Sequence, residues 1–157
     1  MSLYAESSAV LAWLLGEPRA AEVRESLGSA DVVFASDLTL VECDRVLIRA
    51  AHLGEVTEAD AAARRAELVV GAAHWTVLRL GADVIDRARR RFASEPVRTL
   101  DALHLASALA SRAAVPDLAV LSLDDRIRTN ARALGLAVVP ADDTPLPVAA
   151  PGSPPAA

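Results

Sequence analysis

The sequence predicts an α/β protein in which a parallel sheet carries helices on both faces. Short β-type runs alternate with longer helical runs along most of the chain, as in a parallel sheet built with crossover helices. The length of 157 residues suits one domain, and a hydrophobic content of 53% is enough to fill a core. Aromatic residues make up only 3%, so we expect a core of Leu, Val and Ala.

The first part of the chain is predicted to hold two strands and two helices. Ser2–Ala5 is a short strand, and the apolar run Ser8–Leu15 that follows it is a helix. Glu17–Leu27 is the second helix, because Pro18 is favourable in a first turn. Asp31–Ala35 is a buried strand, since successive β-branched and aromatic residues favour the extended state.

The middle of the chain is predicted to form a pair of helices and a strand. Asp37–His52 is amphipathic, with apolar residues recurring on one side, and Gly54 ends it. Thr57–Val70 is a further helix with Thr57 as its cap, and Trp75–Leu80 is a strand.

The last part of the predicted fold contains a helix that is apolar almost all round, Thr99–Ala114, which is typical of a helix packed on several sides. We expect its packing to come from four leucines: Leu100, Leu103, Leu105 and Leu109. The other predicted elements here are helices and strands in alternation: helix Ala82–Ser94, strand Leu118–Leu121, helix Asp124–Leu134 and strand Ala137–Val139.

One domain is expected over residues 1–140. From Pro140 onward, prolines recur among Ala, Asp and Ser. Residues 141–157 are therefore expected to form a loose tail, because this composition cannot bury enough apolar surface to order itself.

The composition excludes several classes of enzyme. All 16 basic residues are arginine, so neither a Schiff-base lysine nor a Walker-A loop is present. The formal net charge of −5 argues against a protein that coats nucleic acid by charge alone. The single cysteine, Cys43, permits no intrachain disulfide, and the N-terminus has no basic region of a signal peptide. We therefore expect a cytoplasmic protein without a membrane span.

Acidic residues stand where a parallel sheet binds its ligands, outside the carboxyl ends of the strands. Glu6 follows the first predicted strand and the pair Asp124-Asp125 follows the fourth. One of this pair can cap the next helix, and the sequence leaves open which one does. Glu42 stands early in its helix, where Thr39 to Glu42 also matches a capping box.

Asp101 is the acid most in need of a partner. It opens the apolar helix, so we expect it to be partly buried, and a metal ion is one of the few partners strong enough for a buried carboxylate. The three histidines, His52, His74 and His104, have no zinc spacing and are interpreted as core or surface residues. Carboxylates without cysteine or histidine ligands at zinc spacing indicate Mg²⁺ or Mn²⁺. Such an ion can activate water and neutralise the negative charge of a phosphodiester.

Serines and arginines complete the candidate site. Ser7 and Ser8 are most simply the cap of the first helix, or else one hydroxyl holds a metal-bound water. The cluster from Arg87 to Arg91 is interpreted as a solvated face. Arg126 and Arg128 follow the Asp pair and are candidates for holding phosphates that enter the acidic cleft.

Four stretches of the chain resemble the motifs of PIN-domain ribonucleases, above all the VapC-type toxins of type II toxin–antitoxin pairs. These are Tyr4–Glu17, Leu38–Leu47, Arg98–Leu109 and Val120–Leu136, and together the resemblance covers residues 1–140. It implies a three-layer α/β/α sandwich. It also implies catalytic and metal-binding roles for four acids: Glu6, Glu42, Asp101 and Asp124. Ser8, Ser122 and Asp125 are the supporting residues.

The resemblance further implies a Mg²⁺-dependent endoribonuclease, with Mn²⁺ as a possible substitute, that forms a homodimer and is blocked by a cognate antitoxin. One departure from the family pattern is Glu6, which stands where the family usually has Asp, so its carboxylate is displaced by one C–C bond. Two alternatives remain: a non-catalytic PIN-like module that binds RNA or protein, and a small α/β domain whose acids are all helix caps.

Overall fold

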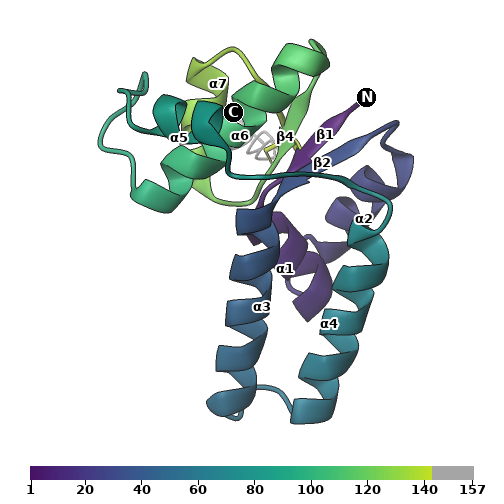
Figure 1. Ribbon diagram of the computed structural model, residues 1–157. Coiled ribbons are helices and arrows are strands. Elements are labelled where there is room, and N and C mark those ends of the chain that lie inside the picture. Colours follow the sequence, from purple (N-terminus) through teal and green to yellow (C-terminus); the bar gives the residue numbers. More distant parts are fainter. Residues whose placement is uncertain (143–157) are drawn as a thin grey trace, which may run out of the picture.

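The computed structural model describes residues 1–142, in which strands and helices alternate along the chain as predicted (Figure 1). The predicted loose tail, residues 141–157, lies outside the described residues from position 143 onward. Within residues 1–142, no helix is both long enough and apolar enough to cross a membrane.

Five parallel strands form one sheet. They are β1 (Leu3–Ala5), β2 (Val33–Ser36), β3 (Thr76–Leu78), β4 (Ala119–Leu121) and β5 (Ala137–Val139). Their order is β3-β2-β1-β4-β5, with Leu3 paired to Val33 on one side and to Ala119 on the other. The chain first builds outward from β1 to β3 and then returns to the opposite side of β1. This reversal opens a crevice beyond the carboxyl ends of β1 and β4, where α/β proteins bind their ligands.

In the part of the chain that the structure describes, seven helices pack around the sheet. They are α1 (Ser7–Leu15), α2 (Ala20–Ser29), α3 (Asp37–His52), α4 (Glu58–Ala72), α5 (Ala82–Ala88), α6 (Thr99–Ala114) and α7 (Asp125–Ala133). Helices α3 and α4 run beside each other and extend well beyond the sheet (Figure 1). The result is the predicted α/β/α sandwich.

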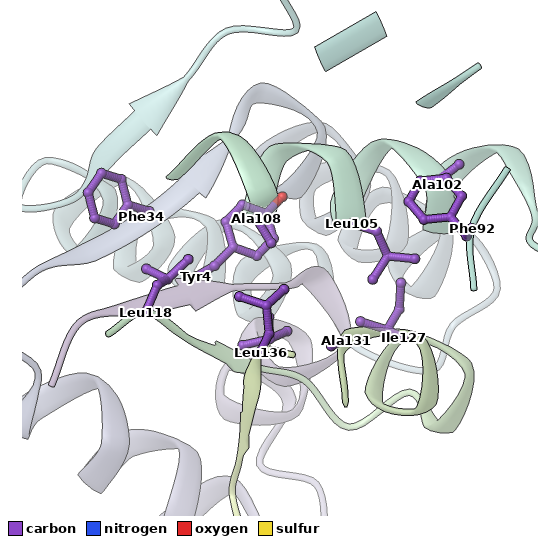
Figure 2. Packing of buried hydrophobic residues seen from close by; sticks show 11 residues of the cluster. Tyr4, Phe34, Phe92, Ala102, Leu105, Ala108, Leu118, Ile127, Ala131 and Leu136 are labelled. Atoms are coloured by element: carbon purple, nitrogen blue, oxygen red, sulfur yellow. The ribbon is translucent and has the colours of Figure 1, made fainter. Parts of the chain in front are cut away.

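The two faces of the sheet follow from the alternation of side chains along each strand. Tyr4 and Phe34 face the layer that contains α6 and α7, where they belong to one apolar cluster with Leu105 and Ile127 (Figure 2). The neighbouring residue Ala5 belongs to a second cluster, with side chains of α1, α3 and α4. Leu, Val, Ile and Ala make up most of the core, as the composition predicts, but the cluster facing α6 and α7 also contains the aromatic rings of Tyr4, Phe34 and Phe92.

Several element boundaries differ from the prediction. The second helix begins at Ala20, after Arg19 has taken a left-handed conformation with φ of 72°, so Pro18 lies before the helix. Helix α5 ends at Ala88, because the chain then turns to bury Phe92 under the Arg87 guanidinium, 4.2 Å from the ring centroid.

The packing of α6 also differs from the prediction. Leu105 is buried and Leu109 packs against the same cluster, as expected, but Leu103 is only half-buried beside a surface pocket and Leu100 is 46% exposed. Leu100 lies in the first turn of α6, where it lines a pocket instead of the core.

Candidate functional site

A polar pocket of about 330 Å³ lies at the crevice beyond β1 and β4. The four acids predicted from the sequence all line it: Glu6, Glu42, Asp101 and Asp124. They come from four separate parts of the fold: the β1–α1 junction, α3, the first turn of α6 and the β4–α7 junction. The fold therefore brings together carboxylates that lie far apart in the sequence.

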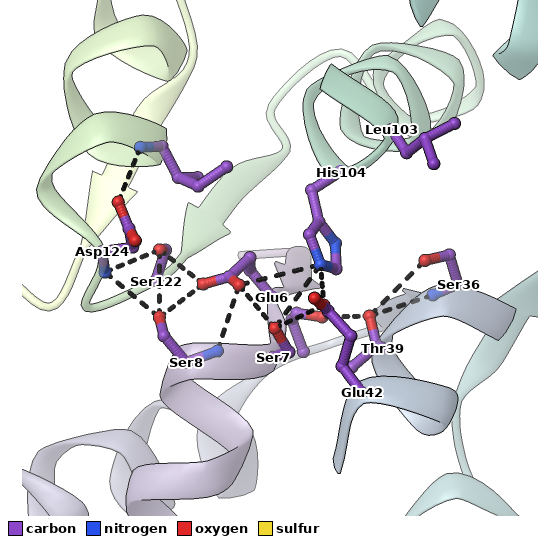
Figure 3. Close-up of polar contacts among 12 residues, drawn as sticks. Glu6, Ser7, Ser8, Ser36, Thr39, Glu42, Leu103, His104, Ser122 and Asp124 are labelled. Carbon is purple, nitrogen blue, oxygen red and sulfur yellow. Dashed lines mark hydrogen bonds and ion pairs between the residues drawn. The ribbon is translucent and has the colours of Figure 1, made fainter. Parts of the chain in front are cut away.

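Glu6 is 4% exposed, and its carboxylate is held by serines (Figure 3). Oε1 accepts hydrogen bonds from Ser7 Oγ at 2.7 Å and from the Ser8 backbone N–H at 3.1 Å. Oε2 accepts from Ser122 Oγ at 2.7 Å and from Ser8 Oγ. Glu6 itself thus caps α1, where Ser7 and Ser8 had been expected to do so.

Ser8 and Ser122 tie the ends of β1 and β4 together. Ser8 Oγ accepts from the backbone N–H groups of Leu123 at 2.9 Å and Asp124 at 3.1 Å while donating to Glu6. Ser122 Oγ also accepts from the Asp124 N–H, at 3.1 Å. This uses the full capacity of the Ser8 hydroxyl, one donor and two acceptor positions, so the junction is fixed.

Glu42 is free of the capping role that the sequence suggested. The capping box of α3 is formed one turn earlier by Ser36 and Thr39, with Thr39 Oγ1 accepting from the Ser36 N–H at 3.4 Å. Glu42 Oε2 instead accepts from His104 Nε2 at 2.6 Å and lies 2.8 Å from Ser7 Oγ, whose single proton it shares with Glu6 Oε1. Burial disfavours the charged form, but the hydrogen bonds from His104 and Ser7 outweigh it and hold the pKa of Glu42 below its ordinary value.

His104 is the site residue that the sequence interpretation missed. It is 2% exposed, its Nε2 lies 3.7 Å from Glu6 Oε1, and its Nδ1 lies 3.0 Å from the Tyr4 hydroxyl. The signal was its position three residues after Asp101, because residues i and i+3 share one face of a helix. Ligand atoms of Glu6, Glu42 and His104 lie within 4.8 Å of one another, close enough to surround a metal ion.

Asp101 has an oxygen without a partner. Its Oδ2 is buried and makes no hydrogen bond. Burial, together with the negative charges of Asp124 and Glu6, raises the pKa of Asp101 above its ordinary value, although Arg98 and Arg126 oppose the shift. The carboxylate is thus held in a place that disfavours its own charge.

Asp124 is the member of the acidic pair that caps α7. Its Oδ1 accepts from the N–H groups of Arg126 at 2.8 Å and Ile127 at 3.3 Å, which suits a carboxylate at a helix start. Asp125 is exposed. The pocket is therefore lined by Asp124 and not by Asp125.

The pocket contains more acceptor oxygens than protons to satisfy them. The Ser7 hydroxyl lies within hydrogen-bond distance of both Glu6 Oε1 and Glu42 Oε2, yet it has only one proton to donate. Asp101 Oδ2 has no donor among residues 1–142. Such a concentration of carboxylate oxygen fits a hard divalent cation such as Mg²⁺ or Mn²⁺.

Of the three arginines near the pocket, Arg128 has a structural role, and Arg98 and Arg126 are exposed. Arg128, which had been expected to hold RNA phosphates, is 2% exposed and donates to the carbonyls of Ser122 at 2.7 Å and Pro140 at 2.8 Å, and to Asp142. The Arg128 guanidinium therefore contacts acceptors within the fold and is not directed to a substrate. Arg126 and Arg98 are exposed, and Arg98 lines the pocket.

Comparison with known proteins identifies the class. The PIN domain family model matches residues 3–140. Ribonuclease VapC46 of Mycobacterium tuberculosis is 35% identical over 138 residues, which are 88% of this chain and 96% of that protein. The chain belongs to the PIN domain family, and within it to the VapC-type ribonucleases.

Solved structures share the fold at low sequence identity. VapC20 of Mycobacterium tuberculosis, a toxin that cleaves the sarcin–ricin loop, matches with a TM-score of 0.59 and 17% identity over 81% of this chain and 93% of its own. VapBC2 of Rickettsia felis, bound to a DNA fragment from its promoter, matches with a TM-score of 0.61 and 9% identity over 88% and 97%. A toxin–antitoxin complex from Klebsiella pneumoniae matches with a TM-score of 0.57 and 15% identity over 89% and 97%.

Proposed function

We propose that this protein is a Mg²⁺- or Mn²⁺-dependent endoribonuclease that acts as the toxin of a toxin–antitoxin pair. The observation that carries the proposal is the convergence of four carboxylates on one pocket, with the Oδ2 atom of Asp101 buried and unpartnered among them. The relationship to VapC46 supports the same activity.

Four residues would hold the cation, and each is positioned differently. Glu6 is fixed by serine hydroxyls, Glu42 by His104 and Ser7, and Asp124 by the first turn of α7, whereas Asp101 offers an oxygen with no other partner. The bound cation would neutralise the scissile phosphate and lower the pKa of a water molecule. Ser8 and Ser122 are supporting residues in this proposal, because they fix Glu6 and the loop that contains Asp124.

Exposed arginines at the pocket are suited to the RNA backbone. Arg98 begins α6 and Arg126 lies in the first turn of α7, and the positive charge of each acts on Asp101 in the pocket. Guanidinium groups bind phosphate oxygens in bidentate fashion and position a nucleic acid without reading its sequence. We place RNA phosphates on these two side chains.

The proposed partners are a cognate antitoxin and a second copy of the chain, in the cytoplasm. Support comes from the structural neighbours, two of which are a VapBC assembly on promoter DNA and a toxin–antitoxin complex. By analogy, the antitoxin would block the acidic pocket until it is removed.

The proposal is tested with purified protein and RNA. We expect cleavage with Mg²⁺ or Mn²⁺, complete loss in EDTA and recovery when the cation is restored, because the cation is the group that would lower the pKa of the attacking water. Asp101→Asn should fold and abolish both cleavage and growth arrest on expression, whereas Asp125→Asn should retain both. Cleavage that persists in EDTA would refute the metal-dependent mechanism.

A further inference from the structure

We propose that His104 and Tyr4 form a buried relay that positions the Glu42 carboxylate for the cation, and that His104 does not itself ligate the cation. The inference rests on the proposed function, since the cation is part of it. It assigns His104 a positioning role.

The residues of the relay come from two strands and two helices. Tyr4 lies on β1, Ser36 at the end of β2, His104 on α6 and Glu42 on α3. The Tyr4 hydroxyl lies 3.0 Å from Ser36 Oγ and 3.0 Å from His104 Nδ1. His104 Nε2 lies 2.6 Å from Glu42 Oε2 (Figure 3). Tyr4 and Ser36 are fully buried. Water therefore has little access to the contacts that hold the imidazole.

Both ring nitrogens of His104 are engaged. An ionised carboxylate can only accept, so Nε2 carries the hydrogen in the bond to Glu42. Nδ1 is directed to the Tyr4 hydroxyl, and the Tyr4 and His104 rings meet edge to face at 67°. Rotating the imidazole would break both contacts at once, so Tyr4 fixes the orientation in which His104 meets Glu42.

The consequence is a Glu42 side chain with one free oxygen. His104 and Ser7 both contact Oε2, whereas no hydrogen bond within residues 1–142 reaches Oε1. A glutamate on a helix surface otherwise loses considerable rotamer entropy when it is fixed. The hydrogen bond from His104 fixes the Glu42 rotamer before the cation binds, so this entropy is not lost on binding. It also leaves Glu42 Oε1 available to the cation.

The same hydrogen excludes Nε2 as a ligand. A ring nitrogen that carries a hydrogen has no lone pair to offer a metal ion. Ligation by Nε2 would require His104 to give up its bond to Glu42 and transfer the hydrogen to Nδ1. Glu6 and Glu42 would then lose the donor that lies beside them.

Mn²⁺ affinity tests the positioning role. Free Mn²⁺ is titrated by electron paramagnetic resonance against wild type, His104→Leu, His104→Gln and Tyr4→Phe. Loss of a group that orients a metal ligand typically weakens metal binding about 10–100-fold, and we expect that for His104→Leu. His104→Gln keeps an N–H that can reach Glu42 and should recover most of the affinity.

Tyr4→Phe reports on the relay even if His104→Leu does not fold. It preserves the buried ring but removes the hydroxyl at Nδ1, so we expect weaker Mn²⁺ binding and a lower kcat with little change in KM for RNA. The control is Leu105→Ala, the next residue on α6, which contacts the core and not Glu42. If Leu105→Ala weakens Mn²⁺ binding as much as His104→Leu, the effect is one of stability and the inference is wrong.

The coordination itself is read from the electron spin echo modulation of bound Mn²⁺. We expect no directly coordinated ¹⁴N, and such a signal from the wild type that disappears in His104→Gln would overturn the inference. Wild type that binds no Mn²⁺ would overturn the proposed function together with it. Wild type that binds Mn²⁺ and is matched by both His104 variants and by Tyr4→Phe would overturn the positioning role alone.

Discussion

Asp101 shows how one residue can be unfavourable for folding and necessary for function. Its carboxylate starts a helix, where the dipole favours a negative charge, but its Oδ2 is buried without a donor. Burial and the charges of Asp124 and Glu6 raise its pKa. A bound cation would offset the cost of burying this unpartnered charge. Binding of a cation is therefore the best explanation for an acid at this position.

The stability of the cation-free protein should therefore rise when this charge is removed. The pKa of Asp101 is higher in the folded protein than the unfolded value of about 3.9. Its contribution to stability is complete below the unfolded pKa and is lost as the pH rises through the folded pKa. In EDTA at pH 7, Asp101→Asn should melt at or above the wild-type temperature, with the difference shrinking toward pH 4. A variant that melts clearly below wild type at pH 7 would contradict this explanation, and Asp125→Asn serves as the exposed control.

Helix α6 contributes to the pocket with one face and to the core with another. Its first turn and His104 contribute to the pocket, whereas Leu105 packs in the cluster around Tyr4 and Ile127. The apolar character of Thr99–Ala114 predicted a buried helix but could not show that Leu100 lies outside the core. That distinction depends on where neighbouring helices leave the pocket open, which is a tertiary property.

Core packing and chemistry should therefore be separable within α6. Leu105 is 1% exposed, so Leu105→Ala should lower the free energy of unfolding by about 2–5 kcal/mol through a cavity. Denaturant titration measures this loss. RNA cleavage per folded molecule should be close to wild type, because the pocket side chains are unchanged. A variant that is stable but inactive would show that the core of α6 takes part in the site.

The helix caps show where the sequence could be understood and where it could not. Thr39 to Glu42 fits a capping box, but the helix begins three residues earlier than that pattern requires, so Ser36 and Thr39 form the box and Glu42 is released to the pocket. The boundary depends on where β2 ends. Likewise, the Glu6 carboxylate folds back to accept from the Ser8 N–H and caps α1, in place of the serines that follow it.

At the scale of the whole molecule, alternation of strands and helices predicted a parallel sheet with helices on both faces, and the acids at strand ends predicted that Glu6 and Asp124 meet, because parallel strands align their carboxyl ends. Glu42 and Asp101 lie in helices, and their place in the same site was implied by the resemblance to PIN-domain ribonucleases. His104 and Arg128 could not be assigned in the same way. Each is a polar residue whose partners come from other elements, so only the assembled fold shows that one faces the pocket and the other is buried.

Arg128 links the C-terminal end of the fold to the pocket. Its guanidinium donates to the carbonyl of Ser122, next to the residues that hold Glu6, and to Pro140 and Asp142 beyond β5. Arg132 also contacts Asp142, but its side chain is 44% exposed. Together they hold the pKa of Asp142 below its ordinary value.

The two arginines provide a matched test of this link. Arg128→Met should lower the free energy of unfolding by about 1–3 kcal/mol, because it leaves buried carbonyls without donors. Arg132→Met should cost less than about 1 kcal/mol, as expected for an exposed ion pair. Urea titration of the two variants gives the comparison.

Arg128→Met should also reduce RNA cleavage, because it disturbs the Ser122 junction. The salt dependence of RNA binding should stay unchanged, since the Arg128 guanidinium is not available to phosphates. If Arg128→Met is as stable as wild type and instead weakens the salt dependence of RNA binding, Arg128 is a phosphate contact after all.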